Sequence, residues 1–320
     1  MPVVDIPKDM RDMLTKFDGD ADGILEPFKS TLMARATPSP LYHYTSDIGL
    51  RGILESGRIW LTDMFRLNDP SELRHGFSHA VKLLSDRAKT GPEEAQLFAE
   101  IFADVITEGL ERSAHYFVCS FSTNGDELGQ WRAYADNGRG YALGFDGKAL
   151  ENAFGTDARS STYHMTYDDG VLADIQRRLV EGMFDLISFD LISGRQPGRI
   201  DGATVVAYMK ELAVALAKNA LEAALFFKHE AYINEAEFRF RQLYAAKAPV
   251  PGLKLRYRSS EVVKYREFDW RSVRPEALRR IVVGPAVDRH KGKRFVEDCL
   301  EAFNTGSVEV VHSGIPYRAV

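Results

Sequence analysis

Apolar and polar residues alternate along most of the chain in patterns that predict strands and helices. Residues 41–46 (LYHYTS) and 58–63 (RIWLTD) have the two-residue period of strands, and residues 47–56 between them have helical spacing. Ser46 can cap the start of that helix, and Gly57 can end it. Further strands are predicted at residues 115–122, 138–146, 160–169, 235–245, 253–269, 277–287 and 307–313.

Long helical patterns interrupt these strands at about residues 70–115 and 171–230. Strands separated by irregular groups of helices predict an α+β fold with a mixed or antiparallel sheet core and several inserted helices. Pro38 and Pro40 mark a boundary. We therefore expect a separate N-terminal segment, residues 1–36, followed by a single α+β domain, residues 37–320, that contains both helical insertions.

The N-terminal segment is expected to form a helix, an acidic loop and a second helix. Asp18, Asp20 and Asp22 have the spacing of the first ligands of an EF-hand loop, but Lys29 stands at the twelfth position, where a bidentate Glu is needed. The loop could bind calcium weakly, or it could be a simple acidic turn. We expect calcium to affect the core fold little.

Composition and charge narrow the class of protein. The 320 residues carry a net charge of −5, which argues against strong nonspecific binding to nucleic acid. No apolar run is long enough to span a membrane, the N-terminus lacks the pattern of a secretory signal, and two cysteines cannot form a disulfide framework. We expect a cytoplasmic protein with no membrane partner. Residues 251–300 are locally basic and could contact phosphates or form a solvated surface.

Two aromatic-rich segments carry candidate site residues. His43 and Thr45 share one face of their predicted strand, where His43 could be a core histidine or a ligand-binding group. Trp131 and Tyr134 lie one turn apart on a short predicted helix. Paired aromatics of this kind can belong to the core or can stack on a flat ring such as nicotinamide or adenine.

The segment LNDPSEL begins a predicted helix. Asp69 is a suitable N-cap, while Asn68 is not explained by capping. Glu72, His75 and His79 fall on one face of this helix, which could be a solvated face or part of a metal site.

The strand at residues 235–245 places charged and apolar side chains on opposite faces. Phe238 and Phe240 form the apolar face, and the charged face is made of Glu235, Glu237, Arg239 and Arg241. This charged face could be open to solvent, with ion pairs across strands, or it could line a cleft in which one Glu polarises a substrate hydroxyl.

The order of these segments resembles a bacterial family known as a domain of unknown function. The resemblance covers about residues 40–318 and rests on the blocks LYHYTS, LNDPxE, WxxYA and ExEFR, with FVCSFS, IVVGP and SGIPYR in the same order. The N-terminal acidic segment lies outside it.

The blocks LYHYTS and GILESG also resemble the first strand and helix of ADP-ribosyltransferases of the His-Tyr-Glu type. The resemblance implies an ADP-ribosyltransferase-like sheet, in which Glu237 is the catalytic position of an ExE pair and Glu235 orients the acceptor. Arg239 could pair with Glu235 or contact pyrophosphate. Where that superfamily usually has Gly, this chain has Tyr44. The implied NAD-binding residues are His43, Tyr44, Thr45, Asn68, Trp131, Tyr134 and Arg239, with Tyr134 or Trp131 stacking on nicotinamide.

These observations lead to one functional expectation and two alternatives. The expected activity is NAD-dependent ADP-ribosyl transfer to an unknown protein or nucleic-acid acceptor, or NAD glycohydrolysis, with NAD as substrate and no metal. The first alternative is a noncatalytic module that binds a nucleotide or a partner. The second is a metal-dependent hydrolase that uses Glu72, His75 and His79.

Overall fold

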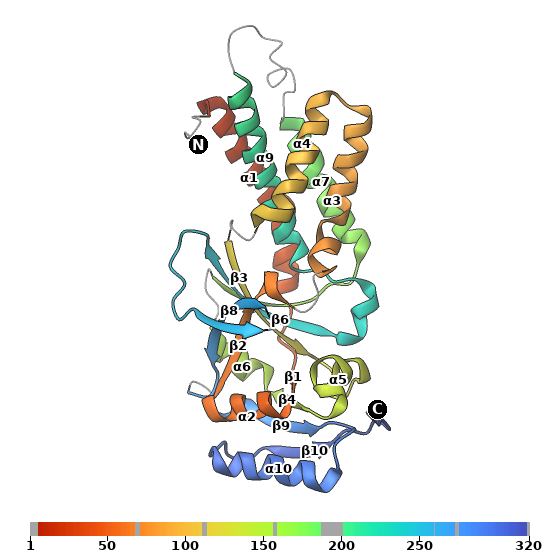
Figure 1. Ribbon diagram of the computed structural model, residues 1–320, viewed down its shortest axis with the longest axis vertical. Coiled ribbons are helices and arrows are strands. Elements are labelled where there is room, and N and C mark those ends of the chain that lie inside the picture. Colours follow the sequence, from red (N-terminus) through yellow and green to blue (C-terminus); the bar gives the residue numbers. More distant parts are fainter. Residues whose placement is uncertain are drawn as a thin grey trace. The chain divides into compact units, whose positions relative to one another are not determined.

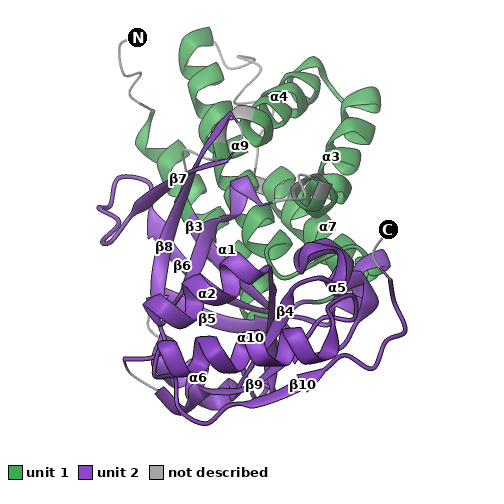
Figure 2. Ribbon diagram, turned by 60° about the horizontal axis from the view of Figure 1, so that its bottom comes forward, with its two compact units in different colours: residues 1–32, 69–115, 166–230 green, residues 33–68, 116–165, 231–320 purple. Residues whose placement is uncertain are grey.

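The computed structural model describes residues 6–67, 71–110, 114–155, 159–186, 201–258, 260–272 and 275–318. Within these residues the chain divides into two compact units, coloured separately in Figure 2. The first, a helical unit, contains residues 1–32, 69–115 and 166–230. The second, a sheet unit, contains residues 33–68, 116–165 and 231–320. The N-terminal segment and both helical insertions thus belong to one unit.

The helical unit is built from long amphipathic helices (Figure 1). They are α1 (Lys8–Met33), α3 (Ser71–Thr90), α4 (Glu93–Asp104), α7 (Asp169–Leu186) and α9 (Gly202–Ala224), and a π-helical turn, Val105–Gly109, follows α4. Helix α3 packs against α4, α7 and α9. Gln176 of α7 is fully buried and bonds to the backbone of α3. Its Oε1 accepts a hydrogen bond from the backbone N of Ala80 over 2.8 Å, and its Nε2 donates to the Gly76 carbonyl.

Helix α1 replaces the predicted helix–loop–helix. Its buried residues, Met10, Phe17, Ala21, Leu25 and Leu32, are spaced by seven or four positions, so a single apolar face runs through the acidic stretch. In a continuous helix Asp18 and Asp22 lie one turn apart on the same side, whereas Asp20 projects away from both, so the three carboxylates do not surround one point as the ligands of an EF-hand loop do. Asp18 instead accepts a hydrogen bond from Asn219 Nδ2 of α9 over 3.0 Å. The predicted acidic loop between two helices is therefore wrong, and calcium binding by these aspartates stays a prediction.

The sheet unit contains the strands on which the candidate site depends. They are β1 (Leu41–Thr45), β2 (Arg58–Asp63), β3 (Ala114–Ser122), β4 (Tyr141–Phe145), β5 (Ser160–His164), β6 (Glu237–Ala245), β7 (Lys254–Arg258), β8 (Glu261–Asp269), β9 (Leu278–Val283) and β10 (Glu309–His312). The helices of this unit are α2 (Asp47–Ser56), α5 (Leu128–Tyr134), α6 (Gly147–Phe154) and α10 (Arg289–Ala302). Short 3-10 turns occur at Met64–Arg66, Asp136–Gly138, Glu230–Glu235 and Pro275–Ala277.

Among the described residues these strands form one mixed, mostly antiparallel open sheet. The main path runs β10-β9-β4-β1-β3-β2-β8-β7, and β6 pairs with both β3 and β5. Strand β10 is parallel to β9, whereas β1 is antiparallel to both β3 and β4. The predicted α+β class is confirmed. The pairing also makes β3 the strand that neighbours both β1 and β6.

The apolar core lies mainly on one face of this sheet. Leu41, Phe121, Phe145 and Phe240 belong to a large buried cluster, against which α2, α6 and α10 place apolar residues. Helix α2 begins and ends as predicted: Ser46 Oγ accepts a hydrogen bond from the backbone N of Gly49, and Gly57 ends the helix with a left-handed φ of 67°. No described helix has both the length and the apolar character needed to cross a lipid bilayer.

Candidate functional site

His43 lies on β1 beside β3. Its Nδ1 is 3.1 Å from the Ser120 carbonyl oxygen, and its ring centroid is 5.6 Å from that of Phe121. Burial lowers the pKa of His43, and the contact with the Ser120 carbonyl opposes this lowering. The ring is therefore neutral at pH 7, with Nδ1–H donating to Ser120. Thr45 follows on the same face and is partly exposed.

Tyr44 and Trp131 form part of the small core on the other face of the sheet. Their rings are 4.8 Å apart, and Trp131 is 0% exposed. The Tyr44 hydroxyl donates to the Asn124 carbonyl and accepts from the backbone N of Glu127, and burial raises its pKa. A ring without an exposed face cannot stack on nicotinamide in this conformation, so Trp131 serves the fold, and of the two proposed aromatics Tyr134 is the accessible one.

Asp126 holds this small core together through hydrogen bonds. Local sequence patterns do not indicate this role. Its Oδ1 accepts hydrogen bonds from Trp131 Nε1 over 2.7 Å and from Ser313 Oγ over 2.6 Å, while Oδ2 accepts from the backbone N of Gly314 over 2.8 Å. Asp126 thus joins α5 to the closing SGIPYR segment. Two partners lie almost 190 residues away in the chain, so no local pattern could reveal them.

Tyr134 is 40% exposed at the end of α5, and its hydroxyl lies 3.4 Å from Glu235 Oε1. The two residues are 101 positions apart, so this contact joins the WxxYA segment to the ExE segment. Glu235 is partly exposed. Its backbone carbonyl accepts a hydrogen bond from Ser122 Oγ over 2.7 Å, which fixes the carboxylate-bearing residue against the end of β3.

Glu235 and Glu237 do not share a strand face as alternation predicts. Ala236 between them has a φ of 44°, in the left-handed region that residues other than glycine rarely adopt, and β6 begins only at Glu237. The Ala236 carbonyl accepts a hydrogen bond from the backbone N of Thr123 over 3.0 Å. This hydrogen bond to Thr123, just after β3, holds the strained turn. The turn points the Glu235 and Glu237 side chains in different directions.

Glu237 and Arg239 form an ion pair inside the protein. Arg239 Nε donates to Glu237 Oε1 over 2.6 Å, and the side chains are 1% and 5% exposed, respectively. Arg241 is also buried and donates to Ser161 Oγ of β5. The charged face of β6 is therefore not a solvent face. Arg239 pairs with Glu237 instead of the predicted Glu235. The burial of Arg239 also leaves little of its surface for a pyrophosphate.

Three residues of β3, Cys119, Ser120 and Ser122, lie near the main candidates. Cys119 lies near Glu237, whose charge adds to burial in raising the pKa of the Cys119 thiol. Ser120 contacts His43 through its carbonyl, and Ser122 contacts the Glu235 backbone. Strand β3 thus brings the first and last sequence blocks together.

The predicted metal ligands of α3 have a different partner. His79 Nε2 and His75 Nε2 lie 2.9 and 3.5 Å from the same oxygen of Asp169, on α7. Burial lowers the pKa of His75, and the hydrogen bond to His79 lowers that of Asp169. No group of three or more His, Cys, Asp or Glu side chains in the described part of the chain is arranged to hold a metal ion. Asn68 and the predicted cap Asp69 lie outside the described residues.

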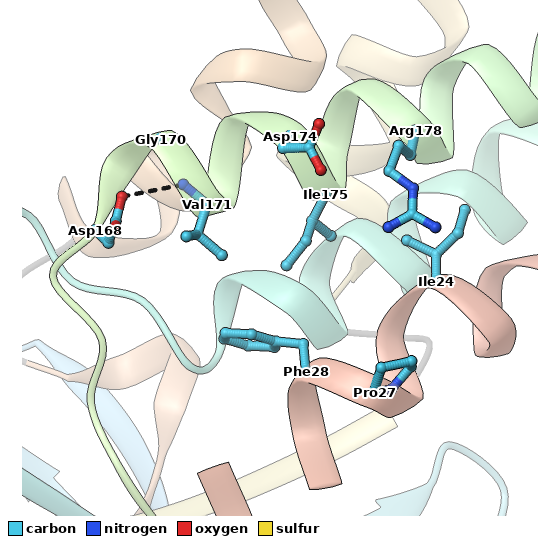
Figure 3. Close-up of a pocket in the computed structure, with 9 residues that line it drawn as sticks. All are labelled: Ile24, Pro27, Phe28, Asp168, Gly170, Val171, Asp174, Ile175 and Arg178. Carbon is cyan, nitrogen blue, oxygen red and sulfur yellow. Dashed lines mark hydrogen bonds between the residues drawn. The ribbon is translucent and has the colours of Figure 1, made fainter. Parts of the chain in front are cut away.

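A pocket of about 390 Å³ occurs in the helical unit, between α1 and the start of α7 (Figure 3). Its lining is mainly apolar, from Ile24, Pro27 and Phe28 on α1 and from Val171 and Ile175 on α7. Polar residues of the lining include Asp168, whose Oδ1 accepts a hydrogen bond from the backbone N of Val171, as well as Asp174 and Arg178. None of the predicted site residues lines this pocket.

Comparison with known proteins finds a family model that matches part of the chain. Residues 130–240 match the family model described as "Protein of unknown function (DUF2971)". The match includes Tyr134, Glu235 and Glu237 and confirms, for this region, the predicted resemblance to a family of unknown function. The individual sequence blocks and the likeness to ADP-ribosyltransferases stay predictions. No curated protein and no solved structure matches the chain.

Proposed function

We propose that the protein is an NAD-dependent ADP-ribosyltransferase or an NAD glycohydrolase-like enzyme. The observation that carries this proposal is the position of β3, which contacts His43 through Ser120, contacts the Glu235 backbone through Ser122 and lies near Glu237 at Cys119. The ADP-ribosyltransferase resemblance assigns roles to these three residues, although they come from segments almost 200 positions apart. The strained turn at Ala236 adds support, because backbone strain is concentrated at functional sites.

In the proposed reaction the bond between nicotinamide and ribose C1′ breaks, and nicotinamide leaves with the bonding electron pair. An acceptor group or a water molecule then forms a bond to C1′ and releases a proton. Glu237, which is paired with Arg239, would accept a hydrogen bond from the ribose 2′-hydroxyl and stabilise the positive charge that develops on the ring. Glu235 would orient the acceptor, Tyr134 would stack on nicotinamide, and His43 would hold the adenosine ribose.

A second candidate function is a noncatalytic module that binds a nucleotide or a partner. The burial of Glu237 and its pairing with Arg239 favour it, because a carboxylate that is 5% exposed offers little surface to a substrate. The two candidates differ in one respect that can be measured. The enzyme binds NAD and releases nicotinamide, a nucleotide-binding module binds NAD without releasing it, and a partner-binding module requires neither.

Purified protein incubated with NAD, with and without cell extract as acceptor, would test the proposal. Nicotinamide would be measured by chromatography and transfer by labelled ADP-ribose. We expect Glu237→Gln and Glu235→Gln to lower turnover, the first by on the order of 100-fold or more, as when a transition-state electrostatic partner is lost. Glu301→Gln, an exposed glutamate of α10, is the matched control and should keep full turnover. NAD binding without nicotinamide release would support the nucleotide-binding module, and the absence of both binding and release would overturn the enzyme.

A further inference from the structure

Strands β2, β8 and β7 present aromatic and charged side chains on one face, where Glu267 is the residue paired with Trp60. Thr62 of β2 and Lys254 of β7 both pair with Tyr265 of β8, and directly paired residues point to the same side of a sheet. Trp60, two residues before Thr62, and Arg256, two residues after Lys254, therefore share the face of Tyr265. The face formed by Trp60, Tyr265, Lys254 and Arg256 is called the Trp60 face below.

Trp60 is the aromatic centre of this face. It is 44% exposed, its ring centroid is 4.6 Å from that of Tyr265, and the Arg256 guanidinium carbon lies 5.3 Å from the Trp60 ring centroid. Arginine often stacks on aromatic rings in this way and keeps its charge there. The result is an exposed aromatic platform with a cation held beside it.

The charge of Arg256 is not neutralised by the described part of the protein. Its basic neighbours are paired, since Arg58 and Lys254 both contact Glu267 at 2.9 and 2.8 Å. No described carboxylate lies within ion-pair distance of Arg256, and its buried Nε makes no hydrogen bond. Burial lowers the pKa of Arg256, and the charge of Arg258 lowers it further. An anion placed here would therefore relieve an unfavourable local charge.

We propose that the Trp60 face binds single-stranded nucleic acid, with a phosphate on Arg256 and a base stacked on Trp60. A single strand offers a flat base and a phosphate in every nucleotide along its length, whereas a phosphoserine or phosphothreonine peptide offers the anion alone. A duplex keeps its bases stacked in pairs and cannot use the platform. The binding is independent of the proposed NAD chemistry, because no residue of the Trp60 face belongs to the candidate site.

Fluorescence anisotropy with labelled single-stranded DNA and RNA oligonucleotides, in the absence of NAD, would test this. We expect saturable binding to single strands of DNA, RNA or both, and weaker binding to the matching duplex. Arg256→Ala and Trp60→Ala should each weaken it by on the order of tenfold. Arg256→Ala should also reduce the slope of log affinity against log salt by roughly 0.7, the contribution of one phosphate in a single strand. Arg256→Gln and Trp60→Leu repeat the test if an alanine variant does not fold.

Two matched controls lie on the opposite face of the same hairpin. Tyr257 is 79% exposed and pairs with Val262, and Lys264 pairs with Leu255. Tyr257→Ala removes an exposed aromatic and Lys264→Ala removes one positive charge, so both should leave affinity and salt slope unchanged. Equal losses in controls and test variants would overturn the proposal. So would the absence of oligonucleotide binding at low salt, stronger binding of a phosphopeptide, or a dimer that covers Trp60 and dissociates when Trp60 is replaced.

Discussion

Arg239 Nε donates a hydrogen bond to Glu237 Oε1 over 2.6 Å, two residues apart on a strand where both side chains are buried. Such a pair costs free energy to desolvate, and its attraction must offset that cost. Removing one partner leaves the other charge buried without compensation. Alternation along β6 alone predicts that Glu237→Gln leaves stability unchanged or raises it; the ion pair reverses that expectation.

Breaking the pair should therefore destabilise the protein strongly. We expect Arg239→Ala to lower the free energy of unfolding by about 3–5 kcal/mol. Glu237→Gln should lower it as well. Urea denaturation would measure both. Arg280→Ala, which breaks the exposed Arg280–Glu309 pair, is the control and should cost only about 0–1 kcal/mol. Equal effects of Arg239→Ala and Arg280→Ala would contradict the buried pairing.

The left-handed backbone at Ala236 gives a second prediction. Glycine adopts a φ of 44° without the clash of a Cβ, so Ala236→Gly should keep or raise stability by up to about 1 kcal/mol. The same change at Ala207, a half-buried position inside α9, should lower stability by about 1 kcal/mol. Thermal unfolding of the two variants would compare them. A loss at Ala236 as large as that at Ala207 would show that its backbone is not strained.

Asp126 should be important for the small core around Trp131. Asp126→Ala removes the acceptor for three hydrogen bonds and leaves the indole N–H buried, so we expect a loss of roughly 3 kcal/mol. Near-ultraviolet circular dichroism would report on Trp131, and denaturation on stability. Ser313→Ala removes one of the three donors and should cost only about 1 kcal/mol. If both variants lost the same amount, the role of Asp126 as a shared acceptor would be wrong.

The lowered pKa of His43 predicts that the free energy of unfolding decreases at acidic pH. The unfolded ring takes up a proton near pH 6.5, whereas the folded ring resists it because of burial. Stability should thus fall as pH drops from about 6.5 to the folded pKa, and His43 should have no effect above that window. His43→Gln removes this contribution, so the difference in melting temperature between wild type and variant should change only in the acidic window. A ring titration by NMR with its midpoint at or above 6.5 would contradict the prediction.

Local sequence patterns determined most elements, because helix and strand formation depend mainly on neighbouring residues. The strands Leu41–Thr45 and Arg58–Asp63 and the helix between them, with Ser46 and Gly57 at its ends, follow from alternation and capping. The α+β class follows from the order of such elements. The acidic stretch of α1 is helical because a helical apolar period continues through it, and the EF-hand spacing of its aspartates does not override that period.

Only the tertiary structure decided the surroundings of the candidate residues. No local rule could bring Tyr134 to Glu235, join Asp126 to Ser313, or place Arg256 over Trp60, because each pair is separated by 101 or more positions. Even Glu235 and Glu237, two residues apart, were separated by a turn at Ala236 that depends on hydrogen bonds from the end of β3. Strand order sets which side chains meet, and it is fixed by the packing of the whole sheet rather than by any one segment.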